Sequence, residues 1–244
     1  LFDSVRGTSA ALYSNLTDAQ ATSSGVTAFN SNGFTVGNNG NGNAVNDSYV
    51  GWQWKANQGT NVTNTSGSIT STVSANTTAG FSIITWSGNS TSGATIGHGL
   101  GVAPKMFIVK NRTNAEGWVV GHTSIGWSNF LQLNNTNASA SSAYPWNNTS
   151  PTSTLITLGS GTGTNGSGYT YVGYAFAEIA GFSKFGSYTG NASADGPFVY
   201  CGFRPKFFLV KASSGGTASV QGWAITDSVR DPYNLATYYL QPNS

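Results

Sequence analysis

The sequence predicts an all-β protein built from tandem antiparallel β-sandwich or jelly-roll-like repeat units of roughly 100 residues. Three observations predict it: short runs of β-branched and aromatic residues, clusters of Gly, Asn and Ser between those runs, and segments that recur along the chain. No amphipathic pattern long enough for a helix of about three turns interrupts the runs. Short antiparallel strands with Gly-rich turns favour closure as a sandwich or jelly roll.

Four runs have the clearest strand composition, because β-branched and aromatic residues in them are bounded by turn-forming residues. They are Phe81–Trp86, Met106–Val109, Tyr171–Phe176 and Phe207–Val210. In Val50–Trp54 and Val172–Phe176, large side chains alternate with small or polar ones. This alternation predicts strands with one heavily buried face and one lighter face.

The chain matches itself at two spacings. The run Gly101–Lys110 recurs as Gly202–Lys211, about 101 residues later. Tyr49–Trp52 recurs as Tyr171–Tyr174, about 122 residues later. Two spacings are expected when loops of different length connect the same strands within one repeated plan.

These matches predict three segments. Residues 79–179 form one complete β repeat unit, residues 1–78 the back half of a preceding unit, and residues 180–244 the front half of a further unit. The motif Asp-Ser-Val-Arg stands near both ends, at Asp3–Arg6 and Asp227–Arg230. Because a half unit exposes the sheet edge that its missing half would cover, we expect the two end segments to pair within the chain or between subunits.

Composition excludes several classes of protein. Only 7% of the residues are charged, and the ten basic and eight acidic side chains give a net charge of +2 without a basic stripe, so we expect no nucleic-acid binding. The chain has no apolar run of about 18 residues and no signal-peptide pattern at its first residues, so we expect no membrane insertion. The single Cys201 excludes an internal disulfide framework.

The groups that could carry out chemistry are few. The fold could bring two carboxylates such as Glu116 and Asp227 together, as in glycoside hydrolases, but none cluster in the sequence. Gly161–Gly166 has the spacing of a dinucleotide fingerprint but leads into a predicted strand instead of a helix. His98 and His122 lie far apart and lack a cysteine pair. We therefore expect a protein that is not an enzyme, with no catalytic, cofactor-binding or metal-binding residues.

Aromatic residues divide into repeated and non-repeated positions. Trp118 and Trp223 stand at matching positions of the repeat, which predicts core packing. Trp127, Tyr144 and Trp146 are not repeated and lie among Asn and Ser residues. Because aromatic faces stack on sugars, these three are the candidate ligand-binding residues of an exposed surface.

Long segments of the chain resemble a repeat domain of tail-fibre and other virion structural proteins of tailed phages, especially marine, cyanophage-like ones. The segments that carry the resemblance are Gly93–Arg112, Trp146–Thr154 and Phe185–Tyr200. The resemblance implies a structural or recognition module of a tail fibre or capsid decoration. It also implies self-association as a homo-oligomer, contact with other virion proteins and host attachment through a surface glycan or protein. The expected localisation is the virion, assembled in the host cytoplasm.

Two alternatives remain open. A bacterial extracellular β-repeat filament or adhesin at the cell surface would share the repeats and the low charge. A fibre-borne glycan hydrolase is less favoured, because no carboxylate pair is visible in the sequence.

Overall fold

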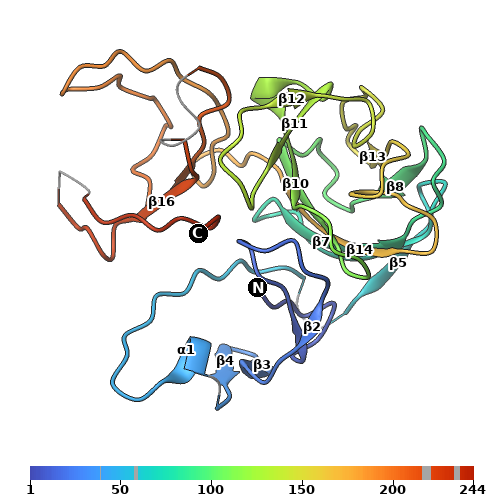
Figure 1. Cartoon of the computed structure of the whole chain (residues 1–244), viewed down its shortest axis with the longest axis horizontal. Helices are drawn as coiled ribbons and strands as arrows, with labels where there is room; N and C mark the ends of the chain where they lie inside the picture. The colour runs from blue at the N-terminus through green and yellow to red at the C-terminus, as the bar shows by residue number, and fades with distance from the viewer. Residues whose placement is uncertain (39, 58–59, 216–220, 234–236) are drawn as a thin grey trace.

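The protein has three lobes around a common centre, and both chain ends lie near that centre (Figure 1). The structure is a computed structural model that describes residues 1–38, 40–57, 60–215, 221–233 and 237–244. We call residues 1–57 the N-terminal lobe, residues 60–179 the central lobe and residues 180–244 the C-terminal lobe. The structural statements below concern the described residues of each lobe.

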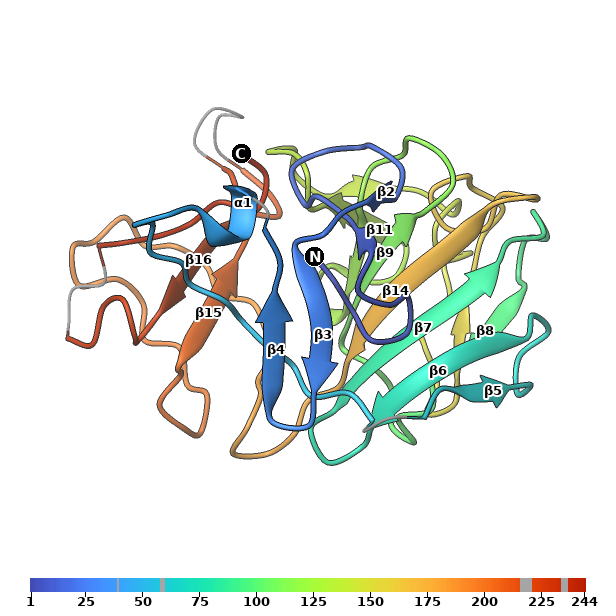
Figure 2. The same cartoon turned by 90° about the horizontal axis from the view of Figure 1, so that it is seen from below.

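The central lobe contains an eight-stranded sheet in the order β12-β11-β10-β9-β14-β7-β6-β5, in which every neighbouring pair is antiparallel. Strands β5, β6, β7 and β14 can be followed side by side in Figure 2. The strands are β5 (Val62–Asn64), β6 (Ser71–Asn76), β7 (Phe81–Ser87), β9 (Met106–Asn111), β10 (Val119–His122), β11 (Asn129–Gln132), β12 (Ala140–Ser141) and β14 (Thr170–Phe176). A single 3-10 turn, η1 (Thr123–Ile125), connects β10 to β11.

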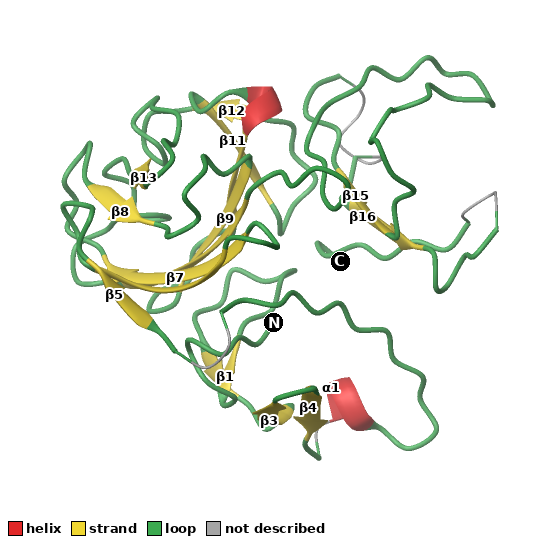
Figure 3. Cartoon of the chain, turned by 180° about the vertical axis from the view of Figure 1, so that it is seen from behind, coloured by secondary structure: helices red, strands yellow, loops and turns green. Residues whose placement is uncertain are grey.

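In the described ranges, four two-stranded sheets accompany the large sheet. In the central lobe, β8 (Thr95–Gly97) pairs with β13 (Leu155–Thr157) and forms a second layer over the curved sheet (Figure 3). The N-terminal lobe has β1 (Ala10–Ala11), β2 (Ala21–Thr22), β3 (Val26–Asn30), β4 (Gly33–Val36) and the one-turn helix α1 (Gly40–Asn43). The C-terminal lobe has the antiparallel pair β15 (Phe207–Val210) and β16 (Ala224–Asp227).

Both faces of the large sheet are buried. Val172 and Tyr174 of β14 pack with residues of the other two lobes, whereas Tyr171 faces the layer of β8 and β13. The expectation of a lighter face at Gly173 is wrong, because a Cβ there would lie 2.4 Å from the ring of Phe107, which fills that face. The large side chain on this face belongs to the neighbouring strand β9, so the alternation within β14 alone does not predict it.

The all-β prediction is confirmed, and each of the four clearest predicted runs lies in a strand: β7, β9, β14 or β15. Val50–Trp54 is not a strand in this structure. Among the described residues, the central lobe has two layers of sheet, and two tandem sandwich units of about 100 residues are not seen. Strands β5 and β6 pair onto β7, so the sheet extends across residue 79, where the sequence places the start of the complete unit.

Candidate functional site

A buried lysine joins the central lobe to the N-terminal lobe. Lys110 of β9 is fully buried, and its Nζ donates hydrogen bonds to the backbone carbonyls of Thr17, Asn111 and Glu116, each at 2.9 Å. Burial lowers the pKa of Lys110 to about 8, and the nearby charges of Glu116 and Asp18 oppose that shift. The three carbonyls supply the hydrogen bonds that a buried ammonium needs, and one of them belongs to the neighbouring lobe.

A buried tryptophan makes a second link between the same two lobes. Trp118 is fully buried, and its Nε1 donates to the backbone carbonyl of Tyr13 at 2.9 Å. Its own backbone N–H donates to Oδ1 of Asn134 at 2.8 Å. The ring packs in the core cluster that also contains Leu12 of the N-terminal lobe. The predicted core position of Trp118 is thus confirmed, and its polar atom contacts another lobe.

The C-terminal lobe contacts the central lobe through matching residues. Lys211, which matches Lys110, donates from Nζ to the carbonyl of Thr136 at 3.1 Å. Trp223, which matches Trp118, is 4% exposed and donates from Nε1 to the carbonyl of Gln132 at 2.9 Å. The same lysine and tryptophan therefore occur at two boundaries between lobes, and each donates to a backbone carbonyl.

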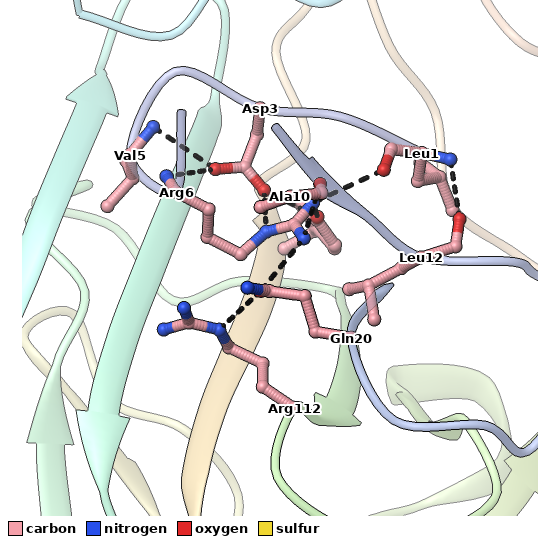
Figure 4. Close-up of polar contacts among 9 residues, drawn as sticks. Leu1, Asp3, Val5, Arg6, Ala10, Leu12, Gln20 and Arg112 are labelled. Atoms are coloured by element: carbon pink, nitrogen blue, oxygen red, sulfur yellow. Dashed lines mark hydrogen bonds and ion pairs between the residues drawn. The ribbon is translucent and has the colours of Figure 1, made fainter. Parts of the chain in front are cut away.

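The Asp3–Arg6 motif forms a buried polar network (Figure 4). Oδ2 of Asp3 accepts hydrogen bonds from Nε of Arg6 at 2.5 Å and from the hydroxyl of Tyr174 at 2.7 Å. Nη2 of Arg6 donates to the same hydroxyl at 3.2 Å, and burial raises the pKa of Tyr174. Gln20 accepts from Nη1 of Arg6 and from Nε of Arg112, which directly follows β9, at 3.3 and 2.8 Å. This network also joins the N-terminal lobe to the central lobe.

The second copy of the motif has the same internal hydrogen bonds. Oδ1 of Asp227 accepts from the backbone N–H groups of Val229 and Arg230 at 3.1 and 3.0 Å, and its Oδ2 accepts from Nε of Arg230 at 2.7 Å. The guanidinium of Arg230 lies 5.8 Å from the ring centre of Trp52, which matches Tyr174 in sequence. Tyr174 and Trp52, which match in sequence, therefore each contact the arginine of one copy of the motif.

These contacts run in one direction around the three lobes. Lys110, Trp118 and Tyr174 of the central lobe contact the N-terminal lobe. Lys211 and Trp223 of the C-terminal lobe contact the central lobe in the same way. Trp52 and Trp54 of the N-terminal lobe contact the C-terminal lobe at Arg230 and Phe207. Each lobe thus contacts both of the other lobes through side chains.

Two of the three candidate recognition residues are buried. Trp127 is 6% exposed and Trp146 fully buried, and their rings meet edge to face at 5.5 Å. Gly121 of β10 makes room for them, because a Cβ there would lie 2.4 Å from the ring of Trp127 and 3.0 Å from that of Trp146. The expectation that these tryptophans are exposed is therefore wrong: their polar neighbours in sequence lie at the surface while the rings fill the core.

Tyr144 is exposed and forms one wall of a surface groove. Its exposed fraction is 69%, and the groove has a volume of about 420 Å³. The residues that line it with Tyr144 are Val119, Phe130, Ser142, Pro145 and residues 160–164. Gly161 lets the loop approach closely, because a Cβ there would lie 3.1 Å from the Cβ of Tyr144. No lining residue carries a charge, so the groove suits an uncharged ligand with apolar and hydroxyl-bearing faces.

Both histidines are held by hydrogen bonds to the backbone, and Nε2 of His98 also lies 3.2 Å from the carbonyl oxygen of Thr152. Nδ1 of His98 accepts from the backbone N–H of Leu100 at 3.2 Å, and Nδ1 of His122 accepts from that of Ser124 at 3.0 Å, at the start of η1. In the part of the chain that the structure describes, no group of three or more His, Cys, Asp or Glu side chains could hold a metal ion. Nor does any helix there have the length and apolar character needed to span a bilayer.

A family model described as a domain of unknown function, DUF7483, matches residues 1–244. The chain belongs to this family. No curated protein and no solved structure matches the chain significantly. Membership of the DUF7483 family assigns no activity, and the features of this DUF7483 chain that point to a function are the contacts between lobes and the Tyr144 groove.

Proposed function

We propose that this DUF7483 chain is a structural and recognition module of a virion appendage, such as a tail fibre or a capsid decoration. The observation that carries the proposal is the repetition of one set of contacts between lobes. Lys110 and Trp118 at one boundary and Lys211 and Trp223 at the next donate to backbone carbonyls of the adjoining lobe. A contact used repeatedly between similar segments is typical of proteins built from repeated structural units.

The proposal includes the repeat organisation that the sequence predicts. A β unit of roughly 100 residues at 79–179, with half units on either side, accounts for the matching positions of the lysines and the tryptophans. The resemblance to virion structural proteins of tailed phages supports the same assignment. In such an appendage the module would associate with copies of itself and with other virion proteins.

Immunogold electron microscopy with an antibody raised against this chain tests the location. Label on the tail fibres or capsid surface of virus particles is the expected result. Label on filaments attached to bacterial cells, with none on particles, would instead support the alternative of an extracellular filament or adhesin.

Recognition is assigned to the Tyr144 groove, because an exposed aromatic ring beside uncharged hydroxyl groups suits a neutral glycan. Tyr144→Ala should reduce binding to a glycan array or to host cells at least about tenfold while the melting temperature stays unchanged. Tyr188→Ala is the matched control, because Tyr188 is exposed and does not line the groove. Equal binding by all three proteins would refute a role of the groove in host attachment.

A further inference from the structure

One edge of β15 in the C-terminal lobe has no strand beside it among the described residues. Its sequence match, β9, lies between β10 and β14, whereas β15 pairs only with β16. An edge strand presents backbone N–H and C=O groups that can pair with a further strand. The position that β14 fills beside β9 is therefore open beside β15.

The chain contains a segment with the sequence of the missing strand. Val50–Trp54 matches Val172–Phe176 of β14, with glycine at the second position and aromatic residues at the third and fifth. None of its residues belongs to a strand in this structure. Val50 is 38% exposed, whereas its match Val172 is fully buried. The segment thus has the composition of an inner strand in an exposed setting.

In the central lobe the ring of Phe107 packs on Gly173, but the matching residues Phe208 and Gly51 are not in contact. Phe107 is fully buried and lies so close to Gly173 that a Cβ on the glycine would be 2.4 Å from the ring. Phe208, which matches Phe107, is 43% exposed. Gly51, which matches Gly173, would place its Cβ within 4 Å of no residue except Gln53. The ring and the space that would receive it are both present and are not in contact.

The segment already lies next to β15. Trp54 matches Phe176 and Phe207 matches Met106, and Phe176 stands directly opposite Met106 in the sheet. The rings of Trp54 and Phe207 are 5.5 Å apart, and the ring of Trp52 is 6.0 Å from that of Phe207. The backbone pairing of the two segments and the contact of Phe208 with Gly51 are missing.

We propose that the open edge of β15 is the interaction surface for Val50–Trp54 of the same chain, which adds as an antiparallel strand in the register of β14 on β9. In that register Val50 stands opposite Lys211, Trp52 opposite Leu209 and Trp54 opposite Phe207. Phe208 then covers Gly51, as Phe107 covers Gly173. The inference stands on these matched contacts and is independent of the proposed virion function.

Disulfide trapping in the full chain tests the register, with Cys201→Ser as the background. Tyr49→Cys with Ala212→Cys places the thiols at the positions of Tyr171 and Asn111, which are opposite each other in the sheet. Tyr49→Cys with Val210→Cys is the control, two residues out of register and beyond disulfide reach. The first pair should form a disulfide within one chain at a yield at least about tenfold above the control, by mass spectrometry and non-reducing electrophoresis.

A second variant tests the packing of the ring on the glycine. Gly51→Val should reduce the in-register disulfide several-fold, because its side chain would occupy the space of the Phe208 ring. Gly33→Val should leave the yield unchanged, because a Cβ at Gly33 has no neighbour within 4 Å. Disulfides mainly between two chains would overturn the proposal and assign the edge of β15 to a second copy. Equal trapping of both cysteine pairs, or no trapping, would also overturn it.

Discussion

Replacing Lys110 by methionine tests whether its ammonium group holds two lobes together. Methionine keeps most of the aliphatic stem, so the change removes the charge and its three hydrogen bonds and leaves the packing of the stem nearly intact. The carbonyls of Thr17, Asn111 and Glu116, each 2.9 Å from Nζ, then lose this donor. Lys211→Met is a matched control in the same chain, because Lys211 donates to two carbonyls among the described residues, of Thr136 and Ala212, and is partly exposed.

The expected loss for Lys110→Met is about 2–4 kcal/mol of unfolding free energy. A hydrogen bond to a charged group contributes about 1.5–3 kcal/mol net, and a buried carbonyl left unpaired costs about 1–3 kcal/mol. The variant no longer buries an ammonium group, and burial of that group is what lowers the pKa of Lys110 to about 8. This gain offsets part of the loss in unfolding free energy. For Lys211→Met we expect about 1 kcal/mol, because solvent can reach its partners.

Urea unfolding followed by tryptophan fluorescence measures both losses, and the chain has seven tryptophans. The two variants and the parent are compared at pH 7 and equal protein concentration. A loss for Lys110→Met no larger than that for Lys211→Met would refute the argument that the number of carbonyls and their burial set the strength of the contact.

Three further changes test other contacts. Gly121→Val should lower the unfolding free energy by about 2 kcal/mol or more, because its side chain would overlap the buried indole rings; an unchanged melting temperature would contradict this. His98→Gln should flatten the fall in stability below pH 6.5, because burial lowers the pKa of His98 from 6.5 and only the unfolded chain takes up its proton there. Urea titrations at pH 7 and about pH 5.5 measure this, and equal falls with and without the histidine would count against it. Asp3→Asn should lower the unfolding free energy by about 3–5 kcal/mol and Asp227→Asn by about 1 kcal/mol. The reason is that the arginine side chain paired with Asp3 is fully buried, whereas that paired with Asp227 is 20% exposed. Comparable losses for the two variants in urea unfolding would be inconsistent with this.

The strands were the most predictable part of the fold. Phe207–Val210 forms β15 with the predicted bounds, and the other three runs fall within β7, β9 and β14. Runs of β-branched and aromatic residues between Gly-rich turns strongly favour strands over other secondary structure. Val50–Trp54 has an equally clear pattern and is not a strand here. A strand needs a partner as well as a pattern, and single-segment patterns do not report partners.

The candidate site was less predictable. The polar neighbours of Trp127 and Trp146 suggested a surface, yet both rings pack in the core, and the available signal was Gly121, a glycine within a strand that marks a close approach. The matching lysines and tryptophans were visible as repeats, but their partners are backbone carbonyls at distant positions. A carbonyl is present at every residue, so no sequence motif marks which ones are contacted. Tyr144 is the one candidate that the structure leaves exposed.

The contacts of Trp118 and Trp223 have a consequence for how such lobes could diverge. Each indole donates to a main-chain oxygen, of Tyr13 in one case and of Gln132 in the other, so the side chain at the accepting position differs while the bond stays the same. The accepting lobe therefore needs the correct backbone path at this position. The hydrogen bond itself places little constraint on which side chain the accepting residue has. Lobes with unlike surfaces can be joined through one invariant connection, which leaves their outward faces open to variation.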